Sequence, residues 1–416
     1  MSTLRAQLRG RALEAFLTPG PVRRALRHAR RRSHTLDVYL QLDDGHSHLL
    51  AQALERLLAR HPELEARVTV VPAPAADADP EPELRSAWTI RDAKLVGQTT
   101  NLEFPERAEA PPADRLRRAN AILLRPRPAR EQLAAAVRVG DALWRGDAEA
   151  LAALTRELGT ATGLEVTPEL EASYRALRKK GHYQGAMVHF GGEWFWGVDR
   201  LPFLLAALQK AGVGEAEPLV REQGTRDSPI DGPLEVFFSF RSPYSYLAIA
   251  RLAARPGPAL LLRPVLPMVM RGLPVPRIKR FYIARDAKRL ADRQGVPFGR
   301  LCDPVGAGVE RCIAVLEALP DEPAKLRFAQ AAMEGIWSRA VEVASDPGLL
   351  AVAEQAGVDE ATVRSALADE GWRATVEENR RALREELGLW GVPSFRLGSF
   401  TVWGQDRMAL LDARQR

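Results

Sequence analysis

The sequence predicts an α/β protein built from two tandem copies of one fold. Its 416 residues exceed what one hydrophobic core usually organises, so two domains are expected. The stretch LEVFFSFRSPYSYL (residues 234–247) passes from an apolar run, typical of a buried strand, into a helical pattern that begins at Pro243. A similar stretch, LDVYLQLDDGHSHL, occurs 198 positions earlier, at residues 36–49. Two similar strand-to-helix units therefore open two similar domains.

Three further pairs of similar segments follow these two stretches in the same order. The segment RDAKL (91–95) matches RDAKRL (285–290). Next, Arg118 and Trp144 match Arg311 and Trp337. Finally, WFWGVDRL (194–201) matches TVWGQDRM (401–408). Segments that recur in one order with small changes of spacing indicate an internal duplication. We expect a first copy at residues 36–210 and a second at residues 232–416, joined by a polar, turn-rich linker at residues 211–231.

Each copy is expected to form a strand, a helix, a second strand, a long helical insertion, and finally a hairpin with a last helix. In the second copy, ALLLRPVLP (259–267) is the next strand, while the Pro-rich residues 72–82 of the first copy form a loop. Helical periodicity in the second copy covers residues 277–293, 307–318, 323–342, 346–355, 359–368 and 372–387. The composition, 46% hydrophobic and 27% charged, is that of a soluble globular protein.

The positive charge of the chain is concentrated at its beginning. The formal net charge is +6, but residues 1–35 hold nine Arg and one Glu, which leaves the rest of the chain close to −2. A basic helical extension is expected there, either a solvated helix packed on the first domain or a mitochondrial transit peptide. A general nucleic-acid surface is not supported. No apolar stretch reaches the roughly 18 residues that a membrane helix needs, so no membrane contact is expected.

The two cysteines, Cys302 and Cys312, are ten positions apart and form no Cys-x-x-Cys motif. A thioredoxin-like redox dithiol and a disulfide framework are therefore excluded. We expect both cysteines to be small core residues rather than nucleophiles. The matched Trp144 and Trp337 are likewise expected in the core. The low cysteine content suits a reducing compartment, and a cytoplasmic location is expected.

Two stretches of the second copy resemble a known family. The first is Ser242-Pro243-Tyr244-Ser245 at the end of the predicted strand, and the second is GLWGVPSFRLGSFTVWGQDRM at residues 388–408. Both are similar to the 2-hydroxychromene-2-carboxylate isomerases and the kappa-class glutathione transferases, which have a DsbA-like thioredoxin fold. The resemblance covers about residues 232–410. It implies two tandem DsbA-like thioredoxin domains, each with a helical insertion, of which the first is degenerate.

The resemblance also implies a glutathione site in the second copy. Ser242 is expected to be the catalytic residue, because it matches the serine that holds the glutathione sulfur. Val392 and Pro393, joined by a cis bond, match the pair whose backbone pairs with the tripeptide like an added strand. The segment that binds the γ-glutamyl end in the family is matched by Gln405, Asp406 and Arg407. The alternative for Asp406 and Arg407 is a structural ion pair. The residues expected at the substrate are Lys279, which would steer an acidic substrate, and Tyr244 and Tyr246, for which plain packing is the alternative.

The first copy lacks these features. Asp44 stands at the serine position, His46 at the tyrosine position, Ala186 at the proline and Val198 in place of Gln405. A carboxylate repels a thiolate, so this copy is expected to be a scaffold, a partner surface or a lid instead of a glutathione site. A metal site at Asp44, His46 and His48 is not expected, because the three side chains do not converge and no fourth ligand is evident.

The resemblance implies a glutathione-dependent isomerase for an aromatic-degradation intermediate of the 2-hydroxychromene-2-carboxylate type. Glutathione would be a cofactor that is not consumed, and the partner would be a small molecule; the oligomeric state is open. A kappa-like glutathione transferase is the first alternative, and a non-catalytic thioredoxin-fold binding module is the second. Thiol–disulfide exchange is disfavoured, since no attacking cysteine stands at position 242.

Overall fold

The computed structural model describes residues 34–214, 218–220, 233–254 and 259–413, together with Gly10, Glu14 and Leu17. These residues divide into two compact units. The N-terminal unit holds residues 34–214 and 218–220, and the C-terminal unit holds the residues from 233 onward with Gly10, Glu14 and Leu17. The predicted basic extension and most of the predicted linker lie outside the described residues. Within the described residues, no helix is both long and apolar enough to span a membrane.

The N-terminal unit begins with a strand, a helix and a second strand, and it ends with a hairpin and a helix. Its elements are β1 (Thr35–Leu40), α3 (Gly45–Arg60), β2 (Glu65–Val70), α4 (Pro82–Thr99), α5 (Ala113–Leu124), α6 (Ala129–Trp144), α7 (Ala148–Leu158), α8 (Val166–Lys180), β3 (Met187–Phe190), β4 (Glu193–Trp196), the 3₁₀ turn η1 (Val198–Arg200) and α9 (Leu201–Gln209).

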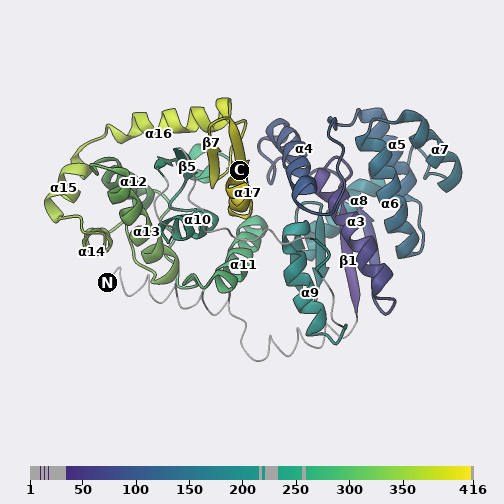
Figure 1. Ribbon diagram of the computed structural model, residues 1–416, viewed down its shortest axis with the longest axis horizontal. Helices are drawn as coiled ribbons and strands as arrows, with labels where there is room; N and C mark the ends of the chain where they lie inside the picture. Colours follow the sequence, from purple (N-terminus) through teal and green to yellow (C-terminus); the bar gives the residue numbers. More distant parts are fainter. Residues whose placement is uncertain are drawn as a thin grey trace. The chain divides into compact units, whose positions relative to one another are not determined.

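The C-terminal unit repeats this order with a larger helical insertion (Figure 1). Its elements are β5 (Leu234–Phe238), α10 (Pro243–Ala253), β6 (Leu260–Pro264), η2 (Met268–Arg271), α11 (Arg277–Gln294), α12 (Ala307–Glu317), α13 (Glu322–Ser338), α14 (Asp346–Gln355), α15 (Glu360–Ala368), α16 (Trp372–Arg381), the π-helical turn η3 (Ala382–Glu386), β7 (Ser394–Leu397), β8 (Phe400–Trp403), η4 (Gln405–Arg407) and α17 (Met408–Ala413).

The two units have the same sheet topology. One sheet has the strand order β2-β1-β3-β4 and the other the order β6-β5-β7-β8. In each, the first strand pairs in parallel with the second and antiparallel with the third, and the third and fourth form an antiparallel hairpin. The predicted fold class is therefore confirmed: the chain is α/β, with two copies of one four-stranded mixed sheet and its helices.

The predicted elements of the second copy match the structure closely, and the main difference has a local cause. The helix expected at residues 323–342 ends at Ser338 in the structure. Ala340 adopts φ of +55°, in the left-handed region that does not continue a right-handed helix. The helix expected at residues 372–387 becomes a π-helical turn at Ala382–Glu386. Both departures occur at helix ends, where a periodic pattern carries little information.

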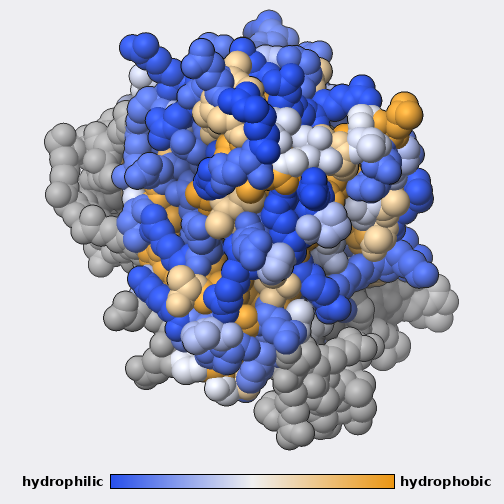
Figure 2. Space-filling model, turned by 90° about the vertical axis from the view of Figure 1, so that its right-hand side faces the viewer, coloured by the Kyte–Doolittle hydropathy of each residue, from blue (hydrophilic) through white to orange (hydrophobic). Residues whose placement is uncertain are grey.

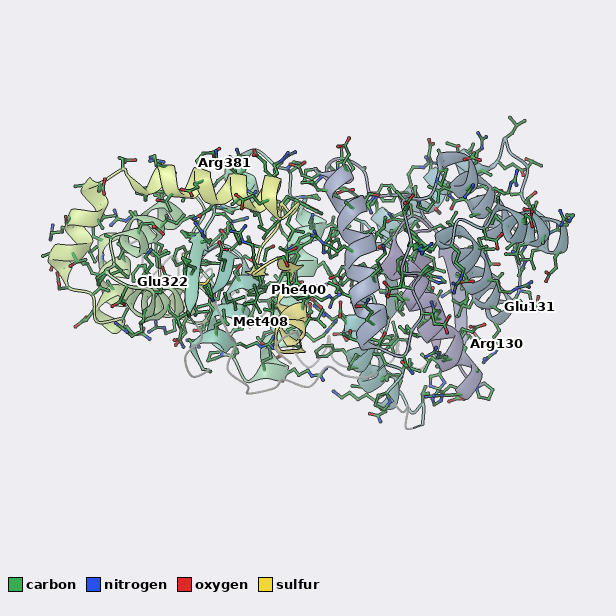
Figure 3. All side chains as sticks on the ribbon, turned by 45° about the horizontal axis from the view of Figure 1, so that its top comes forward. Arg130, Glu131, Glu322, Arg381, Phe400 and Met408 are labelled. Atoms are coloured by element: carbon green, nitrogen blue, oxygen red, sulfur yellow. The ribbon has the colours of Figure 1, made fainter. Side chains whose placement is uncertain are left out.

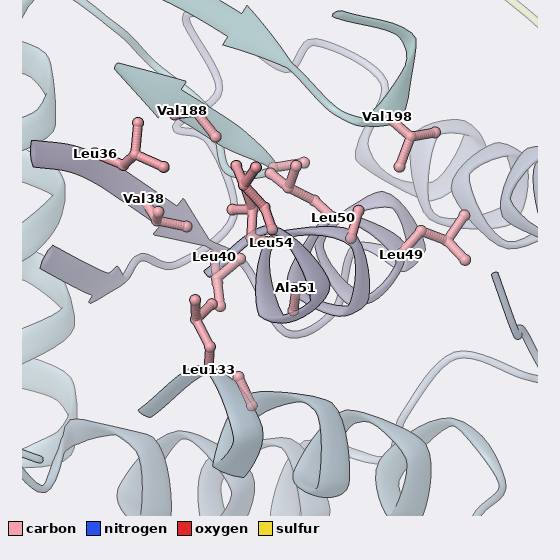
Figure 4. Packing of buried hydrophobic residues seen from close by; sticks show 14 of the residues in the cluster. Leu36, Val38, Leu40, Leu49, Leu50, Ala51, Leu54, Leu133, Val188 and Val198 are labelled. Atoms are coloured by element: carbon pink, nitrogen blue, oxygen red, sulfur yellow. The ribbon is translucent and has the colours of Figure 1, made fainter. Parts of the chain in front are cut away.

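The core of the N-terminal unit lies between its sheet and α3. Leucine and valine side chains of β1, α3 and β3 meet there, among them Leu36, Val38, Leu54 and Val188 (Figure 4). Arg130 on α6 (labelled in Figure 3) donates to the carbonyl oxygens of His61 and Pro62 at 3.1 Å and so ties α6 to the end of α3. On the face shown in Figure 2, apolar residues are scattered among hydrophilic ones.

In the C-terminal unit, α10 packs against α11 and α13 beside β5. Val236, Phe237, Phe238 and Phe240 are fully buried in and after β5, so the strand enters the core before the chain reaches Ser242. Apolar burial on this scale is the main favourable free energy of folding. The turn between β5 and α10 is thereby fixed on a rigid framework.

Candidate active site

The hydroxyl of Ser242 joins the start of α10 to a segment 150 residues later. Ser242 is the N-cap of α10, and its Oγ accepts the N–H of Ser245 at 3.2 Å. The same hydroxyl donates to the carbonyl oxygen of Val392 at 3.2 Å. Pro243 takes the first helical position, where an N–H has no partner within the helix. Two predicted site residues therefore lie together at the positive end of a helix dipole.

The segment that contains Val392 is held in a fixed shape. The peptide bond between Val392 and Pro393 is cis, which confirms the prediction made from the sequence. The carbonyl oxygen of Pro393 accepts the N–H of Gly404 at 2.8 Å, so the end of β8 supports the segment. Trp403 also lies against Gly391, because a Cβ at position 391 would be 2.2 Å from Cζ2 of the Trp403 ring. The peptide backbone opposite Ser242 is thus a rigid edge.

Tyr244 connects α10 to α11. Its hydroxyl donates to Oδ2 of Asp286 at 2.9 Å, and Asp286 is 1% exposed. The guanidinium of Arg289 lies 3.4 Å from the same carboxylate and balances its charge. Lys279 lies half-buried in the first turn of α11. The structure therefore fixes the distance between α10 and the helix that carries Lys279, and the substrate contacts of both residues stay predictions.

Tyr246 lies in the core. Its side chain is 1% exposed, and its hydroxyl donates to the carbonyl oxygen of Pro297 at 2.8 Å. The ring of Phe298 lies between those of Tyr246 and Trp337, at centroid distances of 6.5 Å and 5.7 Å. Burial raises the pKa of the Tyr246 hydroxyl above its usual value. Of the two roles expected for this residue, the geometry favours packing.

The three residues predicted at the γ-glutamyl end form the 3₁₀ turn η4. Gln405 and Arg407 are each 2% exposed. The side-chain amide oxygen of Gln405 accepts from Gln294 at 2.9 Å, and its amide nitrogen donates to Asp406. Arg251 of α10 donates to the backbone oxygen of Gln405 at 2.9 Å. Asp406 is the partly exposed member of the three, so its carboxylate is the group in η4 that a ligand can reach.

Arg241, directly before Ser242, forms a two-point ion pair with Asp303. The Arg241 Nε–Asp303 Oδ1 distance is 2.7 Å, and the Nη2–Oδ2 distance is 2.8 Å. The sequence alone does not show where the Arg241 side chain points. In the structure its charge is opposed by a carboxylate from the loop between α11 and α12, a partner that the sequence did not reveal.

The cysteines do not form a redox pair. Neither cysteine is in a disulfide, and Cys312 is fully buried, which raises the pKa of its thiol and disfavours the thiolate. Among the described residues, no group of three or more His, Cys, Asp or Glu side chains has the arrangement of a metal site.

A known protein family matches the part of the chain that holds Ser242, Val392 and Pro393. Residues 233–414 match the family model described as the DSBA-like thioredoxin domain. The C-terminal unit is a DSBA-like thioredoxin domain. A comparison with curated proteins finds no match.

Solved structures with similarity to this chain include enzymes of two kinds. One is a 2-hydroxychromene-2-carboxylate isomerase, with 22% identity and a TM-score of 0.38 over 44% of this chain and 94% of that chain. Another is the cytosolic disulfide reductase DsbM from Pseudomonas aeruginosa, with 19% identity and a TM-score of 0.34 over 44% and 98%. A probable DsbA oxidoreductase from Streptomyces coelicolor has 20% identity and a TM-score of 0.35 over 44% and 87%.

The N-terminal unit repeats the internal contacts of the DSBA-like domain at matching positions. His46 corresponds to Tyr244, and its Nε2 lies 3.2 Å from Oδ2 of Asp92, which corresponds to Asp286. Both side chains are almost fully buried. The aromatic series Tyr246, Phe298 and Trp337 recurs as His48, Phe104 and Trp144, with centroid distances of 6.2 Å and 5.2 Å. The framework of contacts is therefore common to both units.

The residues around Asp44 differ from those around Ser242. The Asp44 carboxylate caps α3 by accepting the N–H of His46 at 3.2 Å, and it also accepts the hydroxyl of Thr89. An ionised carboxylate accepts hydrogen bonds but cannot donate one to a carbonyl oxygen or a thiolate. The N–H of Ala186 donates to Ser47 Oγ at 2.9 Å, and Ala186 has φ of +51°. These contacts support the prediction that the N-terminal unit is not a glutathione site.

A cluster of three rings that includes His46 lies at the start of α3 in the N-terminal unit. The ring centroid of His46 is 5.3 Å from that of Trp88 and 4.8 Å from that of Trp196. Trp88 and Arg85 were not predicted as site residues; they stand 194 positions before Tyr282 and Lys279. The RDAK segments of the two copies are also 194 positions apart, so the same alignment, continued toward the N-terminus, pairs Trp88 with Tyr282 and Arg85 with Lys279.

Proposed function

We propose that the DSBA-like domain binds glutathione at Ser242 and acts as a glutathione-dependent isomerase of the 2-hydroxychromene-2-carboxylate type. The observation that supports this most is the hydrogen bond from Ser242 to the Val392 carbonyl. It brings a hydroxyl, a helix N-terminus and the partly exposed residue Val392 to one place. These are the groups that a thiol-containing peptide needs: a donor for sulfur and a backbone to pair with.

The groups present fit a γ-glutamyl tripeptide. The N-terminus of α10 and the Ser242 hydroxyl favour an anion. The backbone at Val392 offers a carbonyl oxygen, which is 3.2 Å from Ser242 Oγ. The partly exposed Asp406 carries the charge that an α-ammonium group prefers. The site therefore offers groups that complement the thiol, one peptide N–H and the α-ammonium group of the ligand.

Ser242 would change its hydrogen-bond partner when the ligand arrives. In the structure its single proton is directed to the Val392 carbonyl oxygen. A ligand N–H that pairs with this oxygen releases the serine proton, which is then free to turn toward sulfur. Glutathione, when bound, supplies the thiolate that adds to an unsaturated carbonyl compound and leaves again. Ser242 stabilises the thiolate as a donor and does not itself react, and Lys279 attracts an acidic substrate.

Disulfide exchange by the chain itself is not supported. The position of an attacking cysteine is held by Ser242, and Cys312 is fully buried. A glutathione transferase would use the same site, but the conjugate would leave the enzyme. The two activities differ in whether glutathione is consumed.

The first prediction concerns glutathione binding by the full chain. We expect calorimetry to show binding of reduced glutathione, and Ser242→Ala to retain most of the affinity. In this variant the pKa of the bound thiol should rise by about one unit or more, because a hydrogen bond to a charged group contributes ~1.5–3 kcal/mol. The pKa is measured from the ultraviolet absorbance of the thiolate against pH.

The matched control is Asp44→Ala, at the corresponding position of the N-terminal unit, which should leave glutathione binding unchanged. Loss of glutathione binding in Asp44→Ala would place the site in the N-terminal unit and contradict the proposal. No binding to the wild-type chain would refute the proposed function. With 2-hydroxychromene-2-carboxylate as substrate, an unchanged glutathione concentration indicates the isomerase and its depletion indicates the transferase.

A further inference from the structure

The residue directly before Ser242 forms an ion pair with Asp303. Arg241 precedes Ser242 directly, and its guanidinium side chain is 16% exposed. The two hydrogen bonds to Asp303 have good geometry, with distances of 2.7 Å and 2.8 Å. Asp303 Oδ1 also accepts the N–H of Val305 at 3.2 Å, which fixes the carboxylate within its loop. The pair is therefore oriented at both ends.

The backbones on both sides of the pair are anchored on the end of α13. Nε1 of Trp337 donates to the carbonyl oxygen of Phe240, the residue before Arg241, at 3.1 Å. The N–H of Cys302, the residue before Asp303, donates to the carbonyl oxygen of Ile336 at 3.0 Å. One helix end thus sets the position of both charged residues. An ordinary surface ion pair has no such support and contributes little to stability.

The N-terminal unit has the opposite charge at this position. Asp43 corresponds to Arg241, and the guanidinium of Arg85 lies 3.8 Å from its carboxylate. A cation before the cap residue therefore occurs in the unit that has the serine, and an acid occurs in the unit that has Asp44.

We propose that Asp303 is a positioning residue of the thiol site: it holds the Arg241 guanidinium and cancels its charge beside Ser242. This inference rests on the proposed function. An unpaired cation one residue from Ser242 would add to the effect of the helix N-terminus and over-stabilise the thiolate. A thiolate of very low basicity is a poor nucleophile, and attack is fastest when the thiol pKa is near the ambient pH. Asp303 keeps the bound thiol in that range.

The other charged groups near the start of α10 are the same in all test variants. Charged groups on the elements that pack against α10 include Lys279, Asp286 and Arg289 of α11, Glu334 of α13, and Asp406 and Arg407 of η4. A change in the thiol titration after substitution at position 241 or 303 therefore reports on the pair itself.

The test compares Asp303→Asn with Arg241→Gln in the full chain, by titrating the absorbance of the bound glutathione thiolate. Asp303→Asn retains an acceptor for Arg241 but removes the negative charge. It should lower the pKa of the bound thiol by about 0.5–1 unit, a three- to tenfold change in its ionisation constant, as expected for one charge at this range in a partly aqueous site. Arg241→Gln leaves the carboxylate without its cation and should raise the pKa of the bound thiol by a similar amount. The double variant should return close to the wild-type curve.

The control is Glu360→Gln, which breaks the ion pair with Arg364 on α15 and should not move the curve. If the pair had a purely structural role, both single variants would shift the pKa of the bound thiol in the same direction, and this result would overturn the inference. Titration curves of Asp303→Asn and Arg241→Gln that are identical to that of Glu360→Gln would overturn the inference as well. In that case the proposed function still stands if the wild-type chain binds glutathione. If the wild-type chain binds no glutathione, both proposals are refuted.

Discussion

At the scale of single residues, burial sets the chemical state of His48. This side chain is 5% exposed, and its Nδ1 has no hydrogen-bond partner among the described residues. The ring lies so close to Gly140 that a Cβ there would be 2.4 Å from Nδ1. Burial lowers the pKa of His48 from 6.5 to about 4, so the ring is neutral at neutral pH. Its counterpart Tyr246 is neutral under the same conditions.

His48 should make the N-terminal unit sensitive to acid. Below about pH 6.5 the unfolded chain binds a proton at this histidine, while the folded chain stays neutral down to about pH 4. Stability is therefore fully present above pH 6.5 and is lost as the pH falls through this window, by on the order of 3 kcal/mol. His48→Phe should remove this part of the loss. Urea unfolding at pH 7 and pH 4.5 measures it, and equal losses in both proteins would contradict the assignment.

At the scale of elements, the hairpin β7–β8 supports the segment opposite Ser242. The rings of Trp390 and Trp403 are 4.6 Å apart at an angle of 59°. Trp403 fills the space beside Gly391, and Arg271 donates to the carbonyl oxygen of Trp390 at 2.7 Å. Only a residue without a side chain fits at position 391. The shape of the proposed binding edge therefore depends on a contact made by β8.

Gly391→Ala tests this dependence. The added Cβ would lie 2.2 Å from Cζ2 and 2.6 Å from Cε2 of Trp403, so the ring must move. We expect a loss of about 1–3 kcal/mol in stability, typical of overpacking, together with weaker glutathione binding by calorimetry. Gly163→Ala is the control, since its Cβ would meet nothing within 4 Å. Wild-type stability and affinity in Gly391→Ala would show that the tryptophan contact is not needed.

At the scale of the whole molecule, each unit has its own sheet and its own buried core. Leu54 is fully buried in the N-terminal unit, and Ser242 belongs to the C-terminal unit. A ligand that binds one folded unit stabilises that unit by mass action. The predicted domain limits, residues 36–210 and 232–416, stay predictions that unfolding experiments can examine.

Scanning calorimetry should resolve two unfolding transitions. Glutathione at 100 times its Kd should stabilise one of them by about 2.7 kcal/mol. Leu54→Ala should destabilise the other by about 2–5 kcal/mol, because it leaves a cavity in the core. A single transition that responds to both changes would show that the units unfold as one body.

How much the sequence could predict depends on whether a feature is local. The strand-to-helix change at Ser242 was predictable because a few adjacent residues carry it, and the cis bond before Pro393 was predictable from the resemblance of this segment to a known family. The duplication was predictable because its repeats keep their order. The pairing of Arg241 with Asp303, 62 residues away, was not, because no local pattern specifies which loop returns to the cap. The burial of Tyr246 was not predictable for the same reason, because residues distant in the sequence, Pro297 and Phe298, contact its side chain.

The backbone of Ala186 makes the divergence of the two copies hard to reverse. Proline fixes φ near −65° and has no N–H, whereas residue 186 has φ of +51° and donates its N–H to Ser47. A mutation to proline at this position would lose the hydrogen bond and distort the chain before any ligand could compensate. Asp44→Ser exchanges one side chain, whereas Ala186→Pro also demands a different backbone conformation. The difference between the two units at this position therefore depends on one dihedral angle.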